Sequence, residues 1–173
     1  MRPLTFVPLV LAATAIAMSG PVHAQQNTSA TYQDWLLQCE MKEGTPAQKI
    51  CIISQTTQMQ NKTQSQPFSR VVFEKPVKGH PEKIAVQVPV NVTIAGNVRL
   101  QTTATDPGIT APFDICIPGG CIARFDIKDD VLQKFRAADG AGKLTFKDAT
   151  GHDVAVPLSF KGFHQALDAL TKE

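Results

Sequence analysis

The chain has 173 residues, 43% of them hydrophobic, with 17 Lys and Arg residues against 15 Asp and Glu residues. In a nucleic-acid-binding protein basic residues would dominate this balance, so a formal net charge of only +2 argues against a nucleic acid partner. The length is that of one domain, large enough to bury a hydrophobic core.

The first 24 residues have the three parts of a secretory signal peptide. A positive residue precedes an apolar run from Phe6 to Met18, and small residues follow up to Ala24. The apolar run is shorter than the ~20 residues that a membrane-spanning helix needs. We therefore predict cleavage between Ala24 and Gln25, an exported protein with no transmembrane segment, and a single domain over residues 25–173.

All four cysteines, Cys39, Cys51, Cys116 and Cys121, lie beyond the predicted cleavage point. An even number of cysteines in an exported chain indicates a disulfide framework, although sequence alone allows three connectivities. Sequence proximity favours Cys39 with Cys51 and Cys116 with Cys121.

Short β-type segments follow one another along the chain. They cover residues 31–39, 49–60, 69–77, 83–94, 97–105, 112–118, 121–127 and a hairpin at 143–160. In the first of them, Trp35, Leu37 and Cys39 are predicted to share one face. The alternation at 83–94 is the strongest β signal, and Pro89 within it indicates an edge position or a bulge. Residues 55–66, rich in Gln and Thr, are predicted to be a solvated strand extension and loop.

Two short helices are predicted, at residues 127–140 and 161–173. The second places Phe163, Ala166, Leu167 and Leu170 at helical spacing, so its apolar face is expected to pack on a sheet. Many short strands with only two brief helices are typical of a mainly β fold, a β-sandwich with one or two short helices.

Motifs of known enzyme chemistry are scarce in this sequence. It has no Gly-x-Ser-x-Gly elbow, phosphate-binding Gly-rich loop or His-Glu-x-x-His motif. His80, His152 and His164 are interpreted as exposed polar residues. An ion at Asp148, His152 and Asp153 is the alternative to an ordinary turn, whose composition these residues also fit. We predict no catalytic residue, no metal and no cofactor.

The cysteines of the segment FDICIPGGCIARFDI, Cys116 and Cys121, have three interpretations. A redox-active pair is usually Cys-x-x-Cys at a helix start, whereas this pair is separated by four residues in a β reversal. A four-thiolate zinc site would have closer pairs and a reducing compartment. A structural disulfide that closes the reversal is the preferred interpretation, and thiol chemistry stays the alternative.

Positive charge gathers on one connector, at Arg70, Lys75, Lys78, His80 and Lys83. It is a candidate contact for an anionic partner surface. A solvated connector that blocks edge pairing is the plainer interpretation.

The assembled chain resembles the invasion-associated locus B family of bacterial exported proteins. The resemblance rests on Trp35 followed by Cys39 and Cys51, and on the segments VQVPVNVTIAGNVRL, PFDICIPGGCIARFDI and LSFKGFHQALDAL. It implies a small immunoglobulin-like β-sandwich, export to the periplasm or cell envelope, and a link in some pathogens to entry into host cells. It also supports two disulfides and implies no catalytic residues.

Three functional hypotheses follow. The first is a non-enzymatic envelope protein that binds a protein or glycan partner through loops or an edge strand, with residues 55–66 and 70–83 as candidates. The second is a periplasmic maintenance or assembly factor that acts by strand addition. The third is a thiol oxidoreductase that uses Cys116 and Cys121.

Overall fold

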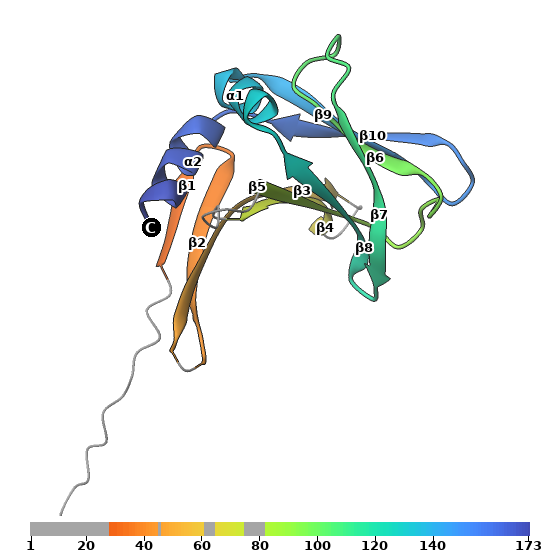
Figure 1. Ribbon diagram of the computed structural model, residues 1–173. Coiled ribbons are helices and arrows are strands. Elements are labelled where there is room, and N and C mark those ends of the chain that lie inside the picture. Colours follow the sequence, from red (N-terminus) through yellow and green to blue (C-terminus); the bar gives the residue numbers. More distant parts are fainter. Residues whose placement is uncertain (1–27, 45, 61–64, 75–81) are drawn as a thin grey trace, which may run out of the picture.

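The computed structural model describes residues 28–44, 46–60, 65–74 and 82–173. They form ten strands and two helices (Figure 1). The elements in chain order are β1 (Thr28–Tyr32), β2 (Trp35–Lys42), β3 (Gln48–Gln60), β4 (Ser65–Glu74), β5 (Glu82–Val88), β6 (Asn97–Gln101), β7 (Ile109–Ile117), β8 (Gly120–Ile127), α1 (Asp129–Ala137), β9 (Ala141–Lys147), β10 (Asp153–Ser159) and α2 (Phe163–Lys172). The predicted signal peptide and its cleavage point lie outside the described residues.

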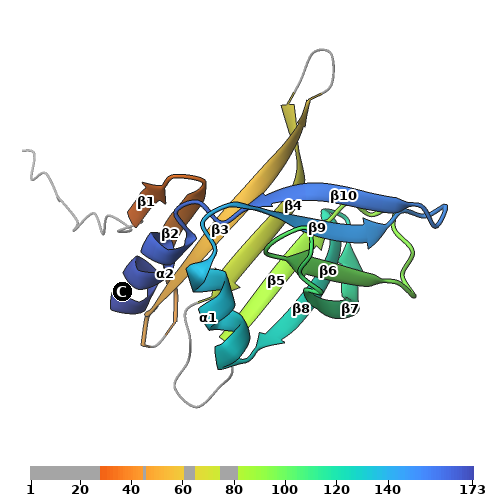
Figure 2. The same cartoon turned by 90° about the horizontal axis from the view of Figure 1, so that it is seen from above.

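The strands form two layers that are joined through β7. Every pairing is antiparallel, and the strand order is β1-β2-β3-β4-β5-β8-β7-β6-β9-β10. The first part of β7 pairs with β6, and its second part, from Phe113 on, pairs with β8. In Figure 2, β9 and β10 cross over β3 and β4, so the smaller layer (β6, β9, β10) covers one face of the larger layer (β1 to β5, β8).

This architecture confirms the predicted mainly β, immunoglobulin-like sandwich with two short helices. The shared strand β7 is a feature that the sequence did not indicate. Among the described residues, no helix is long and apolar enough to cross a membrane. The single domain over residues 25–173 stays a prediction, although the buried residues of the described part form one hydrophobic cluster.

An aromatic cluster lies where the helices meet the larger layer. Trp35 is 1% exposed, and its ring centroid lies 5.0 Å from that of Phe163 and 5.8 Å from that of Phe73. Phe163 and Phe73 are themselves 4.7 Å apart. Trp35, Leu37 and Cys39 are all buried, which confirms the predicted face of this strand. The four predicted apolar residues of α2 are buried as well, which confirms how this helix packs.

The start of α2 depends on a glycine. Gly162 has φ +82°, in the left-handed region that favours glycine. A Cβ at this position would collide with the carbonyl oxygen of Tyr32, at the end of β1. The helix therefore approaches the turn between β1 and β2 closely, and the N–H of Asp34 donates to the carbonyl of Lys161 in the same place.

Gln55 corrects the prediction that residues 55–66 are solvated. Its side chain is buried, and it connects the two layers by accepting from the N–H of Ser159 (2.8 Å) and donating to the Ser159 carbonyl (3.0 Å). The amide group thus pairs with the backbone of β10 as a neighbouring strand would. Propensity alone cannot distinguish such a side chain from a solvated one, because the partner lies 104 residues away in sequence.

The prediction of one strand through residues 83–94 was also wrong in part. β5 ends at Val88, directly before Pro89, and Val90 and Ile94 are 51% and 57% exposed. β5 is a central strand between β4 and β8, not an edge. Proline has no N–H to donate to the hydrogen-bond ladder. The strand therefore ends before Pro89, even though the apolar alternation of the sequence continues beyond this residue.

Candidate binding groove on the concave sheet face

The larger layer is strongly curved, and its outer face is hollow. The helices and the smaller layer lie on one side of it, whereas the hairpins β2–β3 and β7–β8 project from its two flanks to the other side (Figure 1). We call this outer side of β2, β3, β4, β5, β8 and β7 the concave face. Residues that alternate with the buried core positions of these strands point toward it.

Two adjoining hollows follow the concave face. The first, of about 640 Å³, is lined by residues of β2 to β5 and of the turn between β7 and β8, among them Ser54, Thr56 and Gln87. The second, of about 570 Å³, extends along the β2–β3 hairpin past Ile50. Gln38 and Arg70 line both, so the two hollows form one groove.

The strand register places Arg70 in the middle of the groove floor. Arg70 pairs with Thr56 on one side and Gln87 on the other, Gln87 pairs with Ile122, and Ile122 pairs with Ile115. These five residues form one row across β3, β4, β5, β8 and β7. The row combines hydroxyl, guanidinium and amide groups with two isoleucines, so the face can make both polar and apolar contacts with a ligand.

A cross-strand disulfide joins the two strands of each flanking hairpin. Cys39 and Cys51 are directly opposite in β2 and β3, and Cys116 and Cys121 are directly opposite in β7 and β8. This is the pairing that sequence proximity favoured. Cys39, Cys51 and Cys121 are buried, whereas Cys116 is exposed.

The tip of the β7–β8 hairpin is held against β5. The side-chain N–H of Gln87 donates to the carbonyl of Gly119 (2.7 Å). Gly120 has φ +147°, and a Cβ there would collide with the carbonyl oxygen of Val88. Only glycine allows this approach, so the turn Pro118-Gly119-Gly120 fixes one wall of the groove.

The structure describes two of the five basic residues that the sequence analysis grouped, Arg70 and Lys83. Arg70 lies in the groove, whereas Lys83 is exposed at the start of β5, opposite Asp126. Lys75, Lys78 and His80 lie outside the described residues. A partner contact by Arg70, Lys75, Lys78 and Lys83 stays a prediction. Of the four, Arg70 is the one that lies on the floor of the groove.

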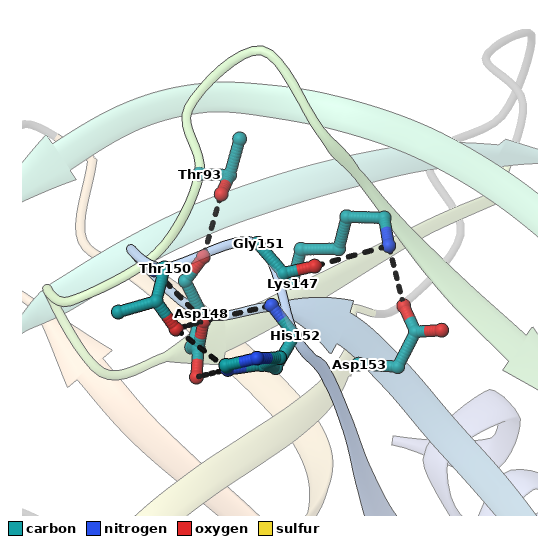
Figure 3. A network of polar contacts seen from close by, with 7 residues as sticks. All are labelled: Thr93, Lys147, Asp148, Thr150, Gly151, His152 and Asp153. Atoms are coloured by element: carbon teal, nitrogen blue, oxygen red, sulfur yellow. Dashed lines mark hydrogen bonds and ion pairs between the residues drawn. The ribbon is translucent and has the colours of Figure 1, made fainter.

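The turn between β9 and β10 is a hydrogen-bonded loop (Figure 3). The carboxylate of Asp148 accepts from the N–H of Thr150 (2.8 Å), the hydroxyl of Thr150 (2.7 Å) and the N–H of His152 (3.0 Å). The hydroxyl of Thr150, followed by the two N–H groups, holds the pKa of Asp148 below its ordinary value. Asp153 is paired with Lys147 instead. These contacts give the Asp and His residues of this turn partners within the chain, as in an ordinary hydrogen-bonded turn.

Two further carboxylates have unusual surroundings away from the groove. Burial alone would raise the pKa of Asp106, but hydrogen bonds from Lys134, Thr102 and Gly108 outweigh it and hold this pKa well below its ordinary value. They fasten the β6–β7 loop to α1. Burial and the nearby Asp129 raise the pKa of Glu82, whose Oε2 is buried without a hydrogen-bond partner in the described part of the chain.

Sequence reasoning missed most of the groove. It identified Arg70 but did not assign a role to the outward-facing Ile50, Ile115 and Ile117. A usable signal was present at Ile115 and Ile117, two apolar residues at the two-residue spacing of one strand face. Phe113 lies on the other face, because the register shifts between Phe113 and Ile115 and Phe113 packs against the core.

Comparisons with known proteins agree with the fold. The model of the family described as invasion associated locus B (IalB) protein matches residues 35–171. The chain belongs to the IalB family. Two relatives, the Invasion protein B homologs of Brucella abortus strain 2308 and of Brucella abortus biovar 1 strain 9-941, are each 27% identical over 168 residues, which cover 94% of this chain and 90% of theirs.

A solved structure has the same fold. The crystal structure of invasion associated protein B from Bartonella henselae matches with a TM-score of 0.68 and 19% identity, over 84% of this chain and 96% of that chain. At this identity the match bears on the fold alone. The resemblance found from the sequence is therefore confirmed by the family match, and the β-sandwich by the structure.

Proposed function

We propose that this IalB-family protein is exported to the cell envelope and acts by binding a protein or glycan partner on its concave face, without catalysis. The observation that carries the proposal is the continuous groove with Arg70 on its floor and a disulfide-linked hairpin on each flank. A rigid, curved surface with polar and apolar side chains in register is suited to recognition.

Export is supported by the cysteines. Both cysteine pairs form disulfides, and such bonds persist in oxidising compartments such as the periplasm or the cell surface. The names of the Brucella and Bartonella proteins associate those proteins with invasion. We extend this association to the present chain as a role in contact with a host cell or with other envelope components.

Compartment is tested by protease treatment of intact cells and of cells whose outer membrane has been opened. Digestion of the protein on intact cells supports contact with a host, and protection until the membrane is opened supports a periplasmic partner. Recovery of the protein in the cytoplasm with its first 24 residues still attached would contradict export.

Binding on the concave face is tested with a photo-crosslinking amino acid placed at Thr56, which is exposed in the groove. The matched control is Gln133, exposed on α1 on the other side of the layer (Figure 1). Illumination of living cells should give a crosslinked product from position 56 and not from position 133. Equal crosslinking at both positions, or none at position 56, would refute a binding role for this face.

A further inference from the structure

Large aliphatic side chains are exposed on both flanks of the groove. Ile50 on the β2–β3 hairpin is 44% exposed, and Ile115 and Ile117 on the β7–β8 hairpin are 48% and 43% exposed. Val90, which lines the groove next to the β7–β8 turn, is 51% exposed. Such residues are usually buried, and their concentration along one face is typical of an interaction site.

Arg70 lies between these two apolar flanks and has no acidic partner. All 15 Asp and Glu residues lie in the described part of the chain, and none forms an ion pair with Arg70. Within the described part of the chain, its guanidinium donates one hydrogen bond, a long one of 3.4 Å, to the hydroxyl of Ser54. Among the described residues that line the first hollow, it is also the only charged one. A half-buried guanidinium in this position can donate two parallel hydrogen bonds to a carboxylate.

We infer that the groove binds a protein segment in which a carboxylate lies between apolar side chains. This inference rests on the proposed function and specifies its partner. The carboxylate pairs with Arg70, and the flanking apolar side chains of the segment contact Ile50 on one hairpin and Ile115 and Ile117 on the other. Arg and exposed aliphatic side chains with few charges at the centre are the composition of the core of a protein interface.

Two other kinds of partner are less compatible with this face. An anionic membrane surface is attracted by several Lys or Arg residues that are not balanced by acidic ones, whereas along this groove Arg70 and Lys42 are balanced by Glu40 and Glu43 on the β2–β3 hairpin. A glycan is commonly held by exposed flat aromatic side chains. Among the described residues the aromatic side chain that lines the groove, Phe68, is partly buried against the hydrophobic core, and the exposed apolar side chains there are aliphatic, namely Met41, Ile50 and Val90.

The test is selection of random 12-residue peptides, displayed on phage, by the full exported chain with both disulfides oxidised. Enriched peptides should contain Asp or Glu flanked by apolar residues. In solution, Arg70→Gln should weaken binding of such a peptide about tenfold or more, because a hydrogen-bonded charge pair is lost. The matched control Arg99→Gln, on β6 of the smaller layer, should leave its affinity unchanged.

The apolar flanks are tested separately with the double variant Ile115→Ser and Ile117→Ser. Both side chains are exposed, so the fold should be retained, and loss of their contacts should weaken peptide binding about tenfold or more. Failure to enrich any peptide, or equal affinity of the enriched peptides for the Arg70→Gln and parent proteins, would overturn the inference.

The chemical nature of the crosslinked product from position 56 distinguishes failure of this inference from failure of the proposed function. If the product contains a protein, it supports both the binding role of the concave face and a protein segment as its partner. A glycan or lipid in the product would keep a binding role for the concave face and refute a peptide segment as its partner.

Discussion

Replacing Gln55 with alanine should destabilise the fold although the residue lies in a polar stretch of sequence. The side chain bonds to both backbone groups of Ser159 and also donates to the carbonyl of Asp34 (3.3 Å). The Ser159 carbonyl keeps a bond from the indole N–H of Trp35 (2.9 Å), but its N–H loses its partner. With about 1–3 kcal/mol for each group left unpaired, we expect a loss of about 3 kcal/mol. For a domain of this size the melting temperature would fall by roughly 6–12 °C.

The assay is urea denaturation followed by the fluorescence of Trp35, the one tryptophan of the chain. This residue is buried next to Ser159, so its emission reports directly on the contact between the layers. The control is Gln58→Ala on the same strand, where the side chain is exposed and the change should stay within about 0.5 kcal/mol. A loss below 1 kcal/mol for Gln55→Ala, or one equal to that of the control, would refute the assigned role.

Three other variants have defined outcomes. Replacing Cys116 and Cys121 with Ser should lower the unfolding free energy by about 2 kcal/mol, the loop-entropy value for so short a ring, and should weaken peptide binding. Unchanged binding would show that the groove does not depend on this disulfide. Asp106→Asn should cost about 1–3 kcal/mol at neutral pH, measured by urea denaturation. Because the pKa of Asp106 is lowered on folding, its contribution to the unfolding free energy is present above the unfolded pKa and is lost as pH falls. The difference in unfolding free energy between parent and variant should therefore shrink in acid. A difference that does not change with pH would contradict this. Gly162→Ala should lower the melting temperature through its collision with Tyr32, whereas an unchanged melting temperature would show that the start of α2 adapts.

Much of the fold could be predicted because its signals are local. Alternation in β2 identified the buried face of Trp35 and Leu37, and helical spacing identified the buried face of α2. The short separation within each cysteine pair favoured the disulfides that the structure forms. These predictions depend on the side chains of single elements, which composition and periodicity describe well.

The groove could not be predicted because it depends on pairing between distant strands. Arg70 and Ile115 belong to one row only because β5 and β8 are neighbours in the larger layer, and the chain between them also builds β6 and the first part of β7. The curvature that makes the face concave is likewise a property of the whole layer. Gln55 was misjudged for the same reason, since its partner Ser159 is far along the chain.

The most direct test of the account is the crosslinking yield from position 56 in cells whose protein carries Arg70→Gln, compared with cells whose protein carries Arg99→Gln. If the concave face binds its partner around Arg70, the yield of the product should fall about tenfold in the first case and stay unchanged in the second. An equal yield from both proteins would contradict the central claim that Arg70 and the groove around it form the binding site.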